Sequence, residues 1–145
     1  MAERAKSEEE LRRLSVEMRY LEQTAEALQQ RISMVNAAIT DISYANLTLD
    51  GIAAEKENAE LFVPIGGSSY VKVKLADSNK VIIGLGSGVS IEKTLMEAKT
   101  TLKERLDELE KTMNSAQQQF TQVAERINSG RSRLENLLGA REGKP

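Results

Sequence analysis

The sequence predicts an α+β chain in which two long helices form an antiparallel coiled-coil hairpin with two β-hairpins between them. Two observations support this fold class. Two long segments carry apolar residues at alternating spacings of three and four, the pattern typical of a coiled coil. The shorter segment between them alternates apolar and polar residues and is interrupted by glycine-rich turns, as β-hairpins are.

Composition limits the possible functions of the chain. Its 145 residues fit one domain, 1–145, but 3% aromatic residues and no Trp argue against a large globular core. A net charge of −2 gives no electrostatic reason to expect nucleic acid or an anionic membrane as a partner. The chain has no Cys and no His, so the common nucleophile, general base and metal ligands are missing. We therefore expect no enzyme activity, no catalytic residues, no metal and no cofactor.

The sequence shows no evident membrane-spanning helix and no evident secretory signal. No apolar run approaches the roughly 20 residues that a membrane-spanning helix needs, and residues 1–7 lack the apolar stretch of a secretory signal. We therefore expect a cytoplasmic protein.

The first helix is predicted over residues 8–58. Ser7 and Glu10 form a capping box at its start. Asn46 interrupts an apolar seam, where it either sets the register with the partner helix or marks the point at which the seam opens to solvent. The two predicted seams are Leu11, Met18, Ala25, Ile32, Ile39, Asn46, Ala53 and Leu14, Leu21, Leu28, Val35, Ile42, Leu49, Lys56.

The second helix is predicted over residues 94–139. Thr94 and Glu97 form its capping box, and Gly139 provides a C-terminal stop. Gly130 should weaken the helix interior, at a cost of about 1 kcal/mol relative to Ala. Its seams are Leu95, Leu102, Leu109, Ala116, Val123, Gly130, Leu137 and Leu106, Met113, Phe120, Ile127, Leu134.

The seams of the first helix match those of the second in length, which favours an antiparallel hairpin within one chain. Leu11 then falls near Leu137 and Ile42 near Leu106, and both termini meet at one tip. The alternative is a parallel dimer through each helix, with the insert as a passive spacer.

The insert, residues 59–93, is predicted to contain four short strands and to mediate oligomerisation. Turns are expected at residues 66–69, 77–79 and 86–88, and Pro64 suits an edge strand. Four such strands leave edges unpaired and cannot close a barrel, so we expect this sheet to be completed by other chains. Phe62 and Ile82, on the nominally outer face, suggest that this face also meets apolar surface. The alternation assigns to the inward face Leu61, Val63, Ile65, Val71, Val73, Leu75, Val81, Ile83 and Leu85, and Val89 and Ile91 form the last strand.

Two catalytic or ligand-binding interpretations are weak. The glycines at 84, 86 and 88 follow a strand, but their spacing is not that of a dinucleotide fingerprint, and a Walker loop would need Gly-Lys-Ser/Thr. A tight hairpin explains these glycines better. The many carboxylates alternate with Lys and Arg, as on the solvated flanks of a coiled coil, and two helices do not form the concave pocket that acid–base chemistry needs.

The helix ends carry a candidate binding surface. Ordinary seam packing explains most of these leucines, but fraying at the tip would expose an apolar patch suited to weak contact with other apolar chains. The residues are Leu11, Leu14, Leu134, Leu137 and Leu138.

The insert resembles the alpha class of prefoldin. The resemblance rests on residues 61–72 (LFVPIGGSSYVK), 80–86 (KVIIGLG) and 89–93 (VSIEK), and on the order helix, two hairpins, helix over nearly the whole chain. The presence of two hairpins marks the alpha class, and the match is to an archaeal type of subunit.

The resemblance implies a hexamer of two alpha and four beta subunits, in which the hairpins assemble into an intersubunit double β-barrel. It implies an ATP-independent co-chaperone whose coiled-coil tips hold unfolded or nascent polypeptides and deliver them to a group II chaperonin. The five tip leucines would then contact clients. The platform would be formed by Val63, Ile65, Val71, Val73, Val81, Ile83 and Leu85. The alternative function is a coiled-coil scaffold or tether with a β oligomerisation module.

Overall fold

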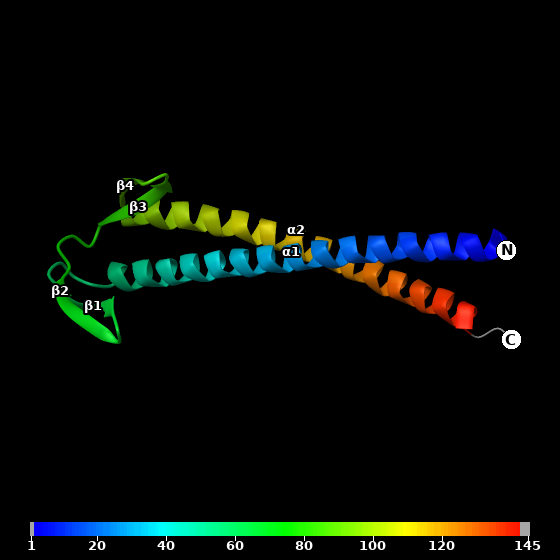
Figure 1. Ribbon diagram of the computed structural model, residues 1–145. Helices are drawn as coiled ribbons and strands as arrows, with labels where there is room; N and C mark the ends of the chain where they lie inside the picture. The colour runs from blue at the N-terminus through cyan, green and yellow to red at the C-terminus, as the bar shows by residue number, and fades with distance from the viewer. Residues whose placement is uncertain (1, 143–145) are drawn as a thin grey trace. The chain divides into compact units, whose positions relative to one another are not determined.

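The computed structural model describes residues 2–142 of the chain (Figure 1). The elements follow in the order α1 (Ala2–Ala53), β1 (Glu60–Gly66), β2 (Ser69–Lys74), β3 (Lys80–Gly86), β4 (Val89–Thr94) and α2 (Leu95–Glu142). Two long helices around two β-hairpins were predicted, and this prediction is confirmed. The chain divides into two compact units, one made of residues up to 37 and from 111 onward, and one of residues 38–110.

Helix α1 begins and ends earlier than predicted. It begins at Ala2, so Ser7 lies inside the helix and the predicted capping box at Ser7 is wrong. The residues before Ser7 are good helix formers, and Glu3 stands in the first turn, where a carboxylate stabilises the positive end of the helix dipole. The helix ends at Ala53, and Asn58 beyond it adopts a left-handed φ of 65°.

Helix α2 begins where the sequence indicates and ends later. The backbone N–H of Glu97 donates to Oγ1 of Thr94 at 3.2 Å, which is one of the two hydrogen bonds of the predicted capping box. The prediction of a stop at Gly139 is wrong, because α2 continues to Glu142. A glycine costs a helix only about 1 kcal/mol relative to Ala, and the residues after Gly139 include the helix formers Ala140 and Arg141.

In the first unit, α1 and α2 pack through the predicted seams. Its most buried apolar side chains are Leu14, Met18, Leu21 and Ala116. A Cβ added to Gly130 would lie 2.3 Å from Sδ of Met18, so the missing side chain of Gly130 makes room for Met18. Gly130 therefore has a packing role in addition to its cost to the helix.

The same contact confirms the antiparallel register. Met18 lies seven residues after Leu11, and Gly130 lies seven residues before Leu137, so the predicted pairing of Leu11 with Leu137 holds.

In the second unit, a small core joins α1, α2 and the second hairpin. Leu49 of α1, Ile83 of β3, and Leu95 and Ala98 of α2 form a buried cluster, with Ile52, Val81 and Leu102 packed against it. Lys99 also pairs with Asp50 across the two helices at 2.5 Å. Because Leu49 is buried, the seam does not open to solvent beside Asn46.

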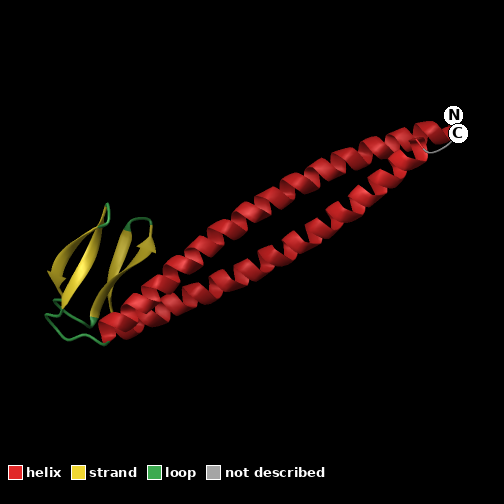
Figure 2. Ribbon diagram, turned by 90° about the horizontal axis from the view of Figure 1, so that it is seen from below, coloured by secondary structure: helices red, strands yellow, loops and turns green. Residues whose placement is uncertain are grey.

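The four strands form two separate antiparallel pairs, β1 with β2 and β3 with β4, which are the two predicted hairpins (Figure 2). Each pair turns over two residues with positive φ, Gly67–Ser68 and Ser87–Gly88, as type I′ hairpins require. Each also has a bulge before its turn, between Pro64 and Gly66 or between Gly84 and Gly86. The turns predicted at these glycines are confirmed.

Candidate functional site

The five predicted tip leucines lie together at the paired helix ends, by which we mean the first turns of α1 and the last turns of α2. Leu14 is only 8% exposed and belongs to the seam. Leu11, Leu134 and Leu137 are half-buried, and Leu138 is 40% exposed. Of the five leucines, Leu138 is therefore the most exposed and Leu14 the only buried one.

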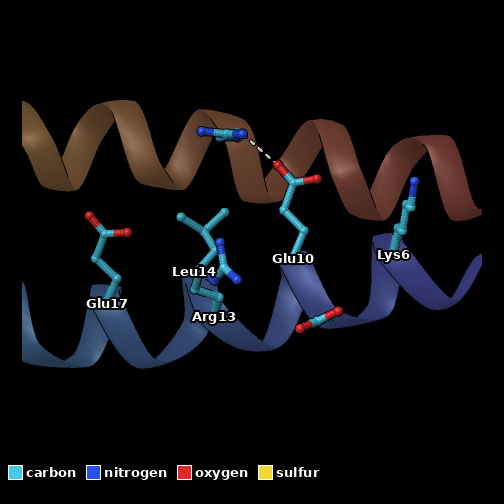
Figure 3. Close-up of a pocket in the computed structure, with 7 residues that line it drawn as sticks. Lys6, Glu10, Arg13, Leu14 and Glu17 are labelled. Carbon is cyan, nitrogen blue, oxygen red and sulfur yellow. Dashed lines mark hydrogen bonds and ion pairs between the residues drawn. The ribbon is translucent and has the colours of Figure 1, made fainter. Parts of the chain in front are cut away.

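A charged groove lies over the buried Leu14. It has a volume of about 280 Å³ and is lined by Lys6, Glu9, Glu10, Arg13, Leu14, Glu17 and Arg133. Figure 3 shows Glu10, Leu14 and Glu17 extending from α1 toward α2. Arg133 of α2 donates from Nη2 to Oε1 of Glu10 at 2.5 Å and so connects the two helices across the groove.

A second groove shares Leu14, Glu17 and Arg133 with the first and continues along α2 past Gly130 to Gln122. Its volume is about 720 Å³. Both grooves are lined mainly by charged and polar side chains of both signs. Their apolar lining residues are Leu14 in both grooves and Val123 in the second.

Exposed apolar residues that the seams did not predict lie on the outside of α1. Val16 and Tyr20 are both more than 60% exposed and lie four residues apart, on the same face of the helix. Neither belongs to a seam, so the seam pattern did not select them. The signal that could have found them was an apolar pair with helical spacing outside both seams.

The predicted platform residues fall into three groups. Val63, Ile65, Val71 and Leu85 are exposed, and Val73 and Val81 are half-buried. Ile83 is 6% exposed and belongs to the core cluster with Leu49, Leu95 and Ala98. The structure therefore assigns Ile83 to packing within the chain, whereas the sequence pattern placed it on a surface between chains.

One face of the first hairpin is apolar and uncovered. Val63 pairs directly with Val71, and Leu61 with Val73, so these four side chains share a face. The opposite face carries the exposed Phe62 and Tyr70. Val89 and Ile91 of β4 are exposed as well; the sequence analysis placed them in a strand without assigning them to the platform.

The described residues hold no cluster suited to metal chemistry. Over residues 2–142, no three or more His, Cys, Asp or Glu side chains are grouped so that they could hold a metal ion. Across the same residues, neither α1 nor α2 has an apolar stretch long enough to cross a bilayer.

Two solved structures share the fold. The chain matches filamentous PFD from Methanocaldococcus jannaschii with a TM-score of 0.66 at 22% identity, over 77% of this chain and 92% of that one. It matches the prefoldin beta subunit from Thermococcus strain KS-1 with a TM-score of 0.59 at 16% identity, over 88% of this chain and 90% of that one.

Sequence comparison gives the family. The model of the prefoldin subunit family matches residues 21–139. The chain is 33% identical to prefoldin subunit alpha of Methanococcoides burtonii, over 93% of this chain and 95% of that protein. It is 34% identical to prefoldin subunit alpha of Methanosarcina barkeri, over 90% of this chain and 93% of that protein. The resemblance predicted from the insert is confirmed, and the chain belongs to the prefoldin family of non-enzymatic co-chaperones, where these archaeal alpha subunits are its relatives.

Proposed function

We propose that this chain captures unfolded or nascent polypeptides at its paired helix ends and delivers them, without ATP, to a group II chaperonin. The observation that carries the proposal is the leucine cluster at these ends. Leu138 is 40% exposed, and Leu11, Leu134 and Leu137 are half-buried. The same helix ends carry two grooves lined by Leu14 and by side chains of both charge signs. Such a surface can bind many apolar segments weakly and without sequence preference.

Assembly is the second part of the proposal. We propose that residues 59–93 join this chain to prefoldin beta subunits in a hexamer of two alpha and four beta chains, through a shared β-barrel. The exposed apolar face of the first hairpin, with Val63, Ile65 and Val71, supports this role because a two-stranded sheet cannot bury such a face alone. Val73, Val81 and Leu85 would extend the contact, and Ile83 would hold β3 in place from beneath. The family relationship supports a cytoplasmic location.

Several linked sites explain how weak contacts retain a client. When one binding site holds a polypeptide, the others meet it at a high effective concentration, so the client leaves only if all of them release it. Release then needs no chemistry, only competition from a chaperonin for the same apolar segments.

Suppression of aggregation tests the chaperone function against the alternative of a scaffold or tether. A denatured client is diluted into buffer with the assembled complex, and light scattering is followed. We expect stoichiometric complex to suppress scattering. Unchanged scattering would leave the scaffold as the better account.

The site within the complex has its own test. Removing about ten residues from each terminus should abolish suppression while the complex still assembles in sedimentation. The substitution Leu138→Ser should weaken suppression, whereas Leu47→Ser, at a leucine of α1 that is also exposed but outside the paired ends, should not. Equal effects of the two substitutions would move the site away from the ends.

A further inference from the structure

The two β-hairpins are built alike, so the outer edges of their first strands can be compared position by position. In β1, Pro64 pairs with Tyr70, the second residue of β2. In β3, Gly84 pairs with Ser90, the second residue of β4. Both positions lie directly before the bulge that precedes the turn. Pro64 and Gly84 are therefore equivalent positions in the two hairpins.

The hydrogen-bond pattern shows which way the backbone faces at these positions. The N–H of Leu75 donates to the carbonyl of Ala59 at 2.9 Å, and that of Leu95 to the carbonyl of Asn79 at 3.2 Å. Bonded and non-bonded pairs alternate along an antiparallel ladder. Counting from these bonds, the pairs of Pro64 with Tyr70 and of Gly84 with Ser90 are non-bonded. The backbone groups of all four residues therefore point away from the partner strand, toward the outer edges.

Each first strand carries a different block at this position. Pro64 has no N–H, so the edge of β1 lacks a donor there. On β3, the carbonyl of Gly84 accepts a hydrogen bond from Nη2 of Arg105 at 2.7 Å. Arg105 reaches the strand from α2, and its half-buried side chain helps to line an apolar groove of about 380 Å³ beside Ile82 and Gly84.

The second strands carry no such block among the described residues. Tyr70 and Lys72 on β2, and Ser90 and Glu92 on β4, all keep a backbone N–H. The side chains of Ser69 and Arg105 donate to hairpin carbonyls, but to those of Gly67 and Gly84 and not to these outward groups. An open row of this kind is a template for a strand of another chain.

We propose that Arg105 blocks strand pairing at the outer edge of β3 in the free chain, as Pro64 does at the outer edge of β1. A strand from a second copy therefore pairs first at β2 or β4. A strand that pairs at β3 must first displace the guanidinium from the Gly84 carbonyl. The proposal goes beyond the function proposed above by naming which edges start the assembly, and it does not depend on client capture.

Replacing Arg105 tests whether its side chain blocks pairing at the edge of β3. Sedimentation velocity of the purified full chain over a range of concentrations gives the concentration at which half of it is self-associated. We expect Arg105→Ala to lower this concentration about three-fold, the effect of about one hydrogen bond. Lys103→Ala, which removes the same charge from an exposed position two residues away on α2, should leave it unchanged. An unchanged value for Arg105→Ala, or an equal shift for Lys103→Ala, would overturn the proposal.

A rescue variant separates a block at this edge from general loss of packing. Gly84→Pro places in β3 the residue that β1 has at the same position. Its lost N–H is outside the ladder, and a Cβ added at Gly84 meets no atom within 4 Å. In Arg105→Ala/Gly84→Pro, self-association should return to the level of the unmodified chain. If the double variant associates as strongly as Arg105→Ala, the arginine does not act through this edge.

A proline on β2 tests whether pairing with a second copy starts at the second strands. Lys72 has the same outward orientation as Tyr70, so Lys72→Pro removes an edge donor and keeps the bonds to β1. Because Lys72 also pairs with Glu60 at 2.9 Å, the matched control is Lys72→Ala, which loses the ion pair alone. We expect Lys72→Pro to self-associate at a concentration about three-fold higher than Lys72→Ala. Glu92 holds the equivalent position on β4, so Glu92→Pro is compared with Glu92→Ala in the same way. Equal concentrations within both pairs of variants would overturn the proposal.

Discussion

At the scale of single residues, Gly130 shows how a local cost serves packing between helices. In a helix interior a glycine is unfavourable, yet Met18 from the opposite helix occupies the space that a side chain at Gly130 would fill. The two residues therefore act as a pair, and the effect of changing one depends on the other.

This dependence predicts that the effect of Gly130→Ala on the free energy of unfolding changes sign when Met18 is replaced. We expect Gly130→Ala to lower the free energy of unfolding by about 1 kcal/mol, because overpacking against Met18 outweighs the helix propensity gained. In a Met18→Ala background the same change should raise it by about 1 kcal/mol, because only the propensity term is left. Urea unfolding followed by circular dichroism measures both, and equal effects in the two backgrounds would contradict the pairing.

Ser87 is a second residue of this kind, and its conformation suggests a substitution that would stabilise the second hairpin. It stands at φ 53° as the first central residue of a type I′ turn, directly before Gly88. Asn-Gly is the favoured pair in such turns. Ser87→Asn should therefore raise the free energy of unfolding of the second hairpin by about 0.5 kcal/mol, measured by thermal unfolding. Ser87→Val should lower it, because a β-branched residue tolerates positive φ poorly.

At the scale of elements, the two hairpins have different roles despite their common construction. The second is anchored to both helices of its unit through Ile83, in the cluster with Leu49 and Leu95, and through the bond from Arg105. The first keeps an uncovered apolar face, with Val71 44% and Ile65 65% exposed. One hairpin therefore contributes to the stability of the chain, while the other has more surface free for assembly.

Aspartate substitutions should separate these roles. Ile83→Asp buries an unpaired carboxylate in the core of the second unit and should lower the free energy of unfolding by about 3 kcal/mol or more. Val71→Asp changes an exposed site, so we expect the unfolding of the chain to stay within about 0.5 kcal/mol while the oligomer dissociates. Thermal unfolding and sedimentation on both variants provide the comparison. Oligomers that survive Val71→Asp would remove Val71 from the assembly surface.

At the scale of the whole molecule, one pair of helix ends makes a poor binding site. Four of its five leucines are wholly or partly covered, and a single exposed leucine contributes only a few kcal/mol at most. Useful retention of a client therefore requires several such ends acting together.

Dissociation should then abolish capture even though every chain keeps its ends. We expect the dissociated Val71→Asp chain to bind an unfolded client at least about 100-fold more weakly than the assembled complex, the gain that linked sites provide. Fluorescence anisotropy of a labelled denatured client measures the two affinities. Similar affinities would mean that each chain binds its client alone.

The parts of the fold that were predictable are those set by local periodicity. The helical spacing, the alternation in the insert and the turn glycines are visible to any local analysis, and the structure confirms the elements they predicted. Two of the errors, Ser7 and Gly139, fall at helix ends, where the free-energy differences between stopping and continuing are about 1 kcal/mol. The exposed Val16 and Tyr20 were missed because their positions lie outside both seams, although they are four residues apart.

The sequence by itself determined the two heptad arms and the hairpins between them, because each of these depends on spacing within a segment. The antiparallel register was predicted from the matched lengths of the arms, and the contact between Met18 and Gly130 decided it. Tertiary structure alone decided three further points: Ile83 is buried, Gly130 accommodates Met18, and Arg105 reaches the carbonyl of Gly84. Each joins residues far apart in the chain, and such contacts depend on how elements pack rather than on any local period.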